Sequence, residues 1–151
     1  MSTIAQATPA PTTRPGVATL PSPDSLPAAA QAAAARGKPL VVMTTLHGCP
    51  YCDVVRGHYL APMARAGEVH AIQLDMTDRR TPLLGFDGRP TTPHAQVKAW
   101  QAPMAPTVLF LGPTGEELAE RLVGIAVQDL YGDYLNARLH EAAGKLGKSR
   151  R

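Results

Sequence analysis

Both cysteines of the chain lie in the stretch HGCPYCDVV, where two residues separate Cys49 from Cys52. A pair at this spacing can form a redox-active disulfide, half of a metal site or a structural bridge. A structural zinc site needs four Cys or His ligands, and none of the five histidines is paired at zinc-finger spacing. A structural bridge this short would close too small a loop to constrain the unfolded chain much. The spacing therefore favours redox chemistry, with Cu(I) binding by the two thiols as an alternative.

The elements around the pair predict different roles for the two cysteines. PLVVMTT (39–45) is a short, mostly apolar run rich in β-branched residues, which indicates a buried strand. The stretch 47–67 then predicts a loop entering a helix, with Pro62 expected to kink or split it. A cysteine at a helix N-terminus has a stabilised thiolate and a lowered pKa. We therefore expect Cys49 to be the nucleophile and Cys52, one turn further on and more buried, to be the resolving thiol.

Three neighbours of the cysteines are candidate contributors to the site. Pro50 suits the first turn of a helix, where it has no N–H to lose. Tyr51 either offers a flat surface beside the attacking sulfur or is simply exposed. His47 is a candidate modulator that would stabilise the thiolate when protonated, or it is merely a solvent-exposed loop residue. We expect neither a metal nor an organic cofactor, because the Cys49–Cys52 disulfide is itself the redox centre.

The rest of the chain predicts a mixed sheet of about four strands with helices on both faces. Strands are expected at 68–75 and 107–111, and 116–124 should return antiparallel after the turn GPTG. The predicted helices have caps or apolar faces that are visible in the sequence. They are 24–37, with Asp24 or Ser25 as N-cap and Gly37 as stop; 91–101, capped by Thr92 with Pro93 in first position; and a final helix whose apolar face comprises Val127, Leu130, Tyr131, Tyr134, Leu135 and Leu139.

The two ends of the chain differ in composition from its body. Residues 1–21 are rich in Pro, Ala and Thr and are expected to be a disordered tether. Residues 22–144 are expected to form one domain, followed by a basic, solvated tail at 145–151. That tail holds four positive charges against a net charge of +3, so the body is close to neutral and nucleic-acid binding has no support. No stretch reaches the roughly 18 apolar residues of a membrane span, and residues 1–20 lack the features of a signal peptide. These observations fit a cytoplasmic protein, or an exported one without its leader.

The chain resembles the thioredoxin superfamily in more than its cysteine pair. Cys49-Pro50-Tyr51-Cys52 follows the strand LVVMTT, and Met104-Ala105-Pro106-Thr107-Val108 lies far downstream, like the active site and cis-proline loop of that family. The resemblance implies an α/β thioredoxin fold in which Pro106 is cis and faces the cysteines. It also implies that the backbone at Ala105 pairs with a substrate peptide, that Thr107 helps to shape the groove, and that Gly124 lies near the active site.

The subfamily is indicated by longer stretches. CPYC is typical of glutaredoxins, but the Gly-Gly-x-x-Asp motif that binds glutathione there is absent, so a glutathione-using enzyme is the alternative. AAARGKPLVV, the extra stretch 77–100 and the ending DLYGDYLNARL resemble exported bacterial thioredoxin-like reductases of the SoxW type, found with sulfur-oxidation genes. That resemblance implies a periplasmic protein that exchanges disulfides with protein substrates and is recharged by a membrane electron donor. We expect it to act as a monomer.

Two departures from thioredoxin accompany this resemblance. Thioredoxins have tryptophans just before the cysteine pair, where this chain has Thr45 and Gly48. They also bury an aspartate beneath the second cysteine with a lysine beside it, and the aligned positions are Met43 and Ala71. A buried proton acceptor of that kind is therefore not expected here.

Overall fold

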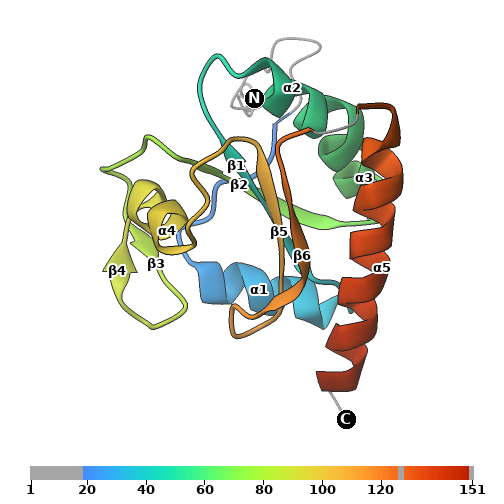
Figure 1. Cartoon of the computed structure of the whole chain (residues 1–151). Helices are drawn as coiled ribbons and strands as arrows, with labels where there is room; N and C mark the ends of the chain where they lie inside the picture. The colour runs from blue at the N-terminus through green and yellow to red at the C-terminus, as the bar shows by residue number, and fades with distance from the viewer. Residues whose placement is uncertain (1–18, 126–127, 150–151) are drawn as a thin grey trace, which may run out of the picture.

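The computed structural model describes residues 19–125 and 128–149 (Figure 1). A central sheet is covered by helices on both faces, and a small hairpin is attached to one side. The elements in chain order are α1 (Leu26–Ala35), β1 (Leu40–Thr45), α2 (Pro50–Val54), the π-helix η1 (Val55–Leu60), α3 (Ala61–Arg65), β2 (His70–Asp75), β3 (Leu83–Leu84), β4 (Pro90–Thr91), α4 (Pro93–Ala99), β5 (Thr107–Leu111), β6 (Glu117–Val123), the 3₁₀-helix η2 (Gln128–Leu130) and α5 (Tyr131–Ser149).

The main sheet has the strand order β2-β1-β5-β6. Strand β1 runs parallel to β2, with Leu40 opposite His70, and antiparallel to β5, with Met43 opposite Val108. Strand β6 returns antiparallel to β5 and completes the sheet. This arrangement confirms the expected mixed sheet of four strands. It also places the carboxyl end of β1, where the cysteine loop begins, next to the amino end of β5, where the proline loop ends.

The sheet separates two hydrophobic cores because alternate residues of each strand point to opposite faces. In β1, Val41 and Met43 belong to the core under α3 and α5, whereas Leu40 and Val42 belong to the core under α1 and α4. All six residues of β1 are buried. The predicted strand 39–45 is mostly apolar for this reason, since both of its faces are covered.

Local capping explains where two of the predicted helices begin. Ser25 caps α1 by accepting a hydrogen bond from the N–H of Ala28 at 3.2 Å. Thr92 caps α4 through the N–H of Ala95, also at 3.2 Å, and Pro93 follows in the first turn. Gly37 ends the α1 region with a φ of 71°, a conformation that glycine adopts at little cost.

The helix after the cysteines changes hydrogen-bond register ahead of Pro62. Six residues of π-helix separate α2 from α3, and the N–H of Ala61 donates to the carbonyl of Arg56, five residues back. Pro62 has no N–H to donate, so it lies at the point where α3 begins. The expectation that Pro62 would kink or split this helix is realised as a π-helical segment just before the proline.

The structure differs from expectation at four places. The final helix continues through Lys145 to Ser149, and Leu146 is buried, so the solvated tail does not begin at residue 145. Leu20 is buried and the carbonyl of Pro21 accepts a hydrogen bond from Gln73, so the domain begins before residue 22. Tyr134 and Leu130 are exposed, whereas the helix also buries Ala142. The hairpin β3–β4, with two residues in each strand, was not predicted.

Some expectations concern residues that the structure does not describe. The tether proposed for residues 1–21 falls almost entirely in this category, as do Val127 and the end of the basic tail at 150–151. None of the helices within the described ranges combines the length and the apolar character that crossing a bilayer requires.

Candidate active site

Cys49 and Cys52 form a disulfide at the start of α2, just after the loop that follows β1. Cys49 is the N-cap of α2, and its Sγ accepts a hydrogen bond from the N–H of Cys52 at 3.2 Å. Cys49 is half-buried, whereas Cys52 is fully buried. The Cα atoms lie 5.2 Å apart, within the usual range for a disulfide. The accessible sulfur is therefore that of Cys49, and a backbone N–H is already directed at it.

The loop before β5 faces the cysteine pair. The Ala105–Pro106 peptide bond is cis, and the carbonyl oxygen of Ala105 lies 4.0 Å from Cys49 Sγ. Pro106 is buried, and Thr107 anchors the loop because its N–H donates to Thr44 Oγ1 at 2.8 Å. The Thr107 hydroxyl donates to the carbonyl of Met104. The structure thus brings together the motif residues at 49–52 and 105–107, more than fifty positions apart in the chain.

Gly124 closes the far side of this loop. Its N–H donates to the carbonyl of Pro106 at 2.8 Å, and its φ is 64°. A Cβ at this position would lie 3.1 Å from Met104 Sδ, so the exposed Met104 side chain would have to shift slightly. The positive φ therefore favours glycine at this position.

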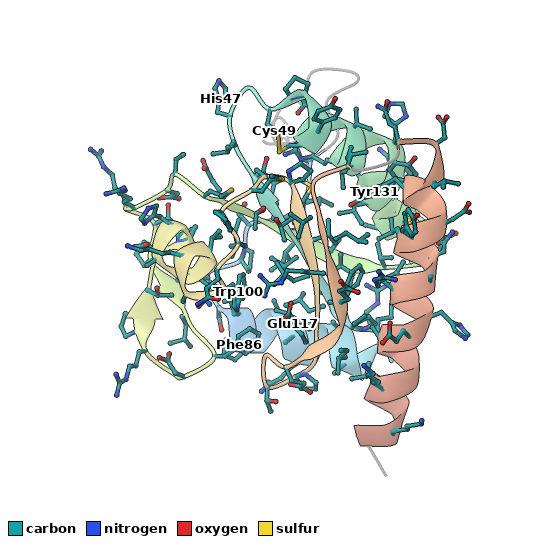
Figure 2. The ribbon with its side chains drawn as sticks, in the orientation of Figure 1. His47, Cys49, Phe86, Trp100, Glu117 and Tyr131 are labelled. Atoms are coloured by element: carbon teal, nitrogen blue, oxygen red, sulfur yellow. A yellow bond between two sulfur atoms is a disulfide. The ribbon has the colours of Figure 1, made fainter. Side chains whose placement is uncertain are left out.

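The other predicted residues lie at the rim of the site. Pro50 occupies the first turn of α2. Tyr51 is 56% exposed, which leaves its ring free to contact a partner or solvent. His47 is exposed, and Figure 2 shows it on the outer side of its loop, pointing away from Cys49. Its ring forms no hydrogen bond with the residues that the structure describes. The modulating role of His47 stays a prediction.

Met43 and Ala71 occupy the core on the side of the sheet that faces α3 and α5. Both are buried among apolar residues. Neither side chain can accept or donate a proton. The positions aligned with the thioredoxin aspartate and lysine are therefore filled by ordinary core packing.

Arg56 is a charged residue of the site that the sequence reasoning missed. Its side chain is only 12% exposed, and it donates to Gln73 Oε1 at 2.8 Å, Thr45 Oγ1 at 2.7 Å and Asp53 Oδ1 at 3.0 Å. The first two bonds tie the helix that follows Cys52 to Gln73 in β2 and to Thr45 at the end of β1. The guanidinium and Asp53 line a polar cleft together with His47 and Gly48 of the cysteine loop. The only sequence signal was an arginine one turn after Cys52.

Tyr131, at the start of α5, is buried against the helix that follows the cysteines (Figure 2). Its ring centroid lies 5.3 Å from that of Tyr59 in the π-helix. Burial, with a smaller contribution from Tyr59, raises the pKa of the Tyr131 phenol far above its usual value. Tyr131 therefore stays neutral and acts as a packing residue between α5 and the helix of the active site.

In the described ranges, no group of three or more His, Cys, Asp or Glu side chains lies close enough together to hold a metal ion. The arrangement of the pair suits two-electron thiol–disulfide exchange instead. One sulfur is accessible and hydrogen-bonded, and the other is buried one helical turn away.

Comparison with known proteins agrees with this geometry. A family model described as a thioredoxin-like domain matches residues 26–138, which is most of the chain. The chain belongs to this thioredoxin-like family. Its members' general chemistry, thiol–disulfide oxidoreduction, is what the paired cysteines of the domain support.

Solved structures that are similar to this thioredoxin-like chain have low sequence identity to it. The oxidoreductase DsbH is 16% identical with a TM-score of 0.56, over 92% of this chain and 95% of that one. Thioredoxin from Fasciola hepatica is 14% identical with a TM-score of 0.51, over 79% and 99%. The periplasmic thioredoxin SoxS from Paracoccus pantotrophus is 23% identical with a TM-score of 0.44, over 70% and 99%. No curated protein matches the chain.

Proposed function

We propose that this protein reduces disulfides in polypeptide substrates through the Cys49/Cys52 dithiol. The observation that carries the proposal is the position of Cys49 Sγ. It is the accessible sulfur, it accepts the N–H of Cys52 at 3.2 Å, and it lies 4.0 Å from the carbonyl of Ala105 in the facing loop. A substrate chain paired with the backbone at Ala105 would present its sulfur to Cys49.

The proposed exchange has two steps. The Cys49 thiolate attacks one sulfur of the substrate disulfide, a mixed disulfide forms, and the other substrate sulfur leaves as a thiolate that takes up a proton. Cys52 then loses its proton and attacks Cys49 Sγ, which releases the second substrate thiolate and forms the Cys49–Cys52 disulfide. Two electrons pass from the dithiol to the substrate, and a reduced thiol donor must restore the dithiol.

The resemblance to exported SoxW-type proteins supports a periplasmic location and a membrane protein as that donor. The glutathione-using alternative rests on the CPYC tetrapeptide, and the Cu(I)-binding alternative rests on the two thiols with the exposed sulfur of Met104. Each makes a different prediction in the same assays. Glutathione would have to support turnover at a rate comparable to a dithiol donor, or Cu(I) would have to bind tightly to a protein with no reductase activity.

The test combines reduction of insulin, followed by turbidity, with the reduction potential measured against glutathione buffers. The reduced wild type should cleave insulin, and Cys49→Ser should abolish the activity. Cys52→Ser should accumulate mixed disulfides through Cys49, because the resolving attack is lost, whereas Cys49→Ser should accumulate few. A potential near the thioredoxin value of about −270 mV supports a reductase, and one near about −120 mV would reverse the direction of electron flow. Equal trapping by both variants would contradict the assigned roles.

A further inference from the structure

A mostly apolar groove lies beside the redox site, on the side of α4. It encloses about 550 Å³, a volume typical of ligand-binding sites. Five apolar residues form most of its wall, and polar side chains complete it. The apolar residues are Leu46, Met76, Val97, Ala102 and Pro103, and the polar ones are Thr77, His94, Lys98 and Gln101.

The groove is continuous with the two loops that form the redox site. Leu46 lies three residues before Cys49, and Pro103 lies three residues before Pro106. Figure 1 shows the loop from α4 rising to the start of β5, close to the start of α2. An extended chain advances about 3.3 Å per residue. A peptide paired at Ala105 would therefore run past the groove, and residues a few positions from its reacting cysteine would lie against it.

The groove wall carries a positive charge and no negative charge. Lys98 is exposed, and its ammonium group forms no ion pair within the part of the chain that the structure describes. No carboxylate lines the groove. The two nearest acidic residues in the sequence lie outside this lining: Asp75 Oδ1 accepts from Thr77, and Asp78 Oδ1 accepts from the N–H groups of Arg80 and Thr81. An acidic side chain on a partner that enters the groove would therefore meet the Lys98 ammonium and no carboxylate in the groove wall.

Gln101 also lines the groove, and its backbone conformation is unusual. Its φ is 55°, and it is the single described residue other than glycine with a positive φ. It follows α4, where its N–H donates to Lys98 and the N–H of Ala102 donates to Val97. Glycine is usual at such a position, and glutamine there carries a conformational cost. Its side chain instead contributes a polar group to the groove wall.

From these observations we propose that the groove is a specificity site for polypeptide substrates. It would take an apolar side chain two or three residues from the target cysteine, and Lys98 would pair with an adjacent acidic residue. This inference rests on the proposed function, because it assumes that a peptide disulfide reacts at Cys49. It adds to that function a substrate class: disulfides flanked by apolar and acidic residues.

The first experiment compares four peptides, each joined to 2-mercaptoethanol through a disulfide at its single cysteine. The positions two and three residues from the cysteine, on both sides, carry Leu or Ser combined with Glu or Lys. The reduced wild type should react fastest with the Leu/Glu peptide. We expect kcat/KM to exceed that for the Leu/Lys peptide roughly three- to tenfold at low salt. The advantage should shrink as salt screens the charges.

Two charge-reversal variants locate the preference. Lys98→Glu should invert the choice between the Leu/Glu and Leu/Lys peptides. Lys148→Glu changes the net charge by the same amount at the far end of α5 and should keep the wild-type choice. Equal inversion by both variants would show general charge steering and overturn the proposal. So would a wild type that does not distinguish the two peptides, or a Lys98→Glu variant that keeps the wild-type choice.

Binding is measured separately on the oxidised, isotope-labelled protein with the Leu/Glu peptide in which serine replaces cysteine. Amide shifts should move at Met76, Val97 and Ala102. Shifts confined to other surfaces would overturn the proposal, as would shifts of these amides that follow the protein's own concentration, because a second copy would then be the occupant. Reaction with uncharged bis(2-hydroxyethyl) disulfide separates the two proposals. If it proceeds normally without peptide preference, only the specificity site fails; if it does not proceed, the proposed function fails.

Discussion

Arg56 shows how one buried charge organises the surroundings of a redox pair. Its three side-chain hydrogen bonds join the helix of Cys52 to Thr45 at the end of β1 and to Gln73 in β2. Thr45 stands where thioredoxins have a tryptophan. In this chain the position is therefore held by a polar contact with a cation rather than by an aromatic ring. The cation also balances Asp53, which lies directly after Cys52.

Replacing Arg56 tests this role at the residue scale. Arg56→Met keeps much of the length of the side chain but removes its donors, so Thr45 and Gln73 lose partners in a half-buried site. We expect the free energy of unfolding to fall by about 1–3 kcal/mol. The pKa of the Cys49 thiol should rise in the reduced protein, because Asp53 is left unbalanced near the thiolate.

Urea denaturation measures the first effect, and thiolate absorbance at 240 nm across pH measures the second. Arg89→Met is the matched control, since Arg89 is an exposed side chain on the hairpin turn. It should change stability by no more than about 0.5 kcal/mol. An unchanged thiol pKa in Arg56→Met would show that the arginine is structural only.

At the scale of elements, α5 has a larger part in the fold than its sequence suggests. Its last turns carry Lys145 and Lys148, and their charge led to the expectation of a solvated tail. Ala142 and Leu146 are nevertheless buried in the core on this face of the sheet. One apolar residue per turn is enough to keep the helix packed, while the lysines project to solvent.

Truncating Leu146 tests whether the end of α5 belongs to the domain. Leu146→Ala should destabilise the protein by about 2–5 kcal/mol, because it removes a buried side chain and leaves a cavity. Thermal or urea unfolding gives the value. Lys148→Ala, on the exposed side of the same turn, should be nearly neutral. A neutral Leu146→Ala would mean that the terminal turns are dispensable and that the domain ends earlier.

At the scale of the whole molecule, His70 links the end of α1 to the outer strand of the sheet. Its Nδ1 lies 3.1 Å from a guanidinium nitrogen of Arg36, the C-cap residue of α1. Burial, and then the charge of Arg36, lower the pKa of His70 below its usual 6.5. The unfolded chain therefore binds more protons than the folded one between the two pKa values, so stability rises with pH there.

The contribution of His70 to the free energy of unfolding should be complete above about pH 6.5. It should be lost as the pH falls through the folded-state pKa of His70. His70→Gln should flatten the dependence of the unfolding free energy on pH across about 5–7. Urea denaturation at several pH values provides the measurement. His140→Gln, which removes an exposed imidazole from α5, is the control and should leave that slope as it is in the wild type. An unchanged slope in His70→Gln would place the pH dependence on other groups.

The sequence by itself determined the features that depend on near neighbours. The buried strand before the cysteines, the caps at Ser25 and Thr92 and the hairpin of β5 and β6 follow from patterns a few residues long. The spacing of Cys49 and Cys52 at the start of a helix was enough to predict redox chemistry. The hairpin of β3 and β4 was missed because strands of two residues are too short to show any periodicity.

Only the tertiary structure decided which distant side chains meet. It placed the carbonyl of Ala105 beside Cys49, tied Arg56 to Gln73 and Thr45, and assembled the groove from the cysteine loop, α4 and the segment after β2. It also showed that a lysine-bearing helix end is packed rather than solvated. These features depend on strand register and on how helices cover the sheet, and local preferences in the chain do not specify either one.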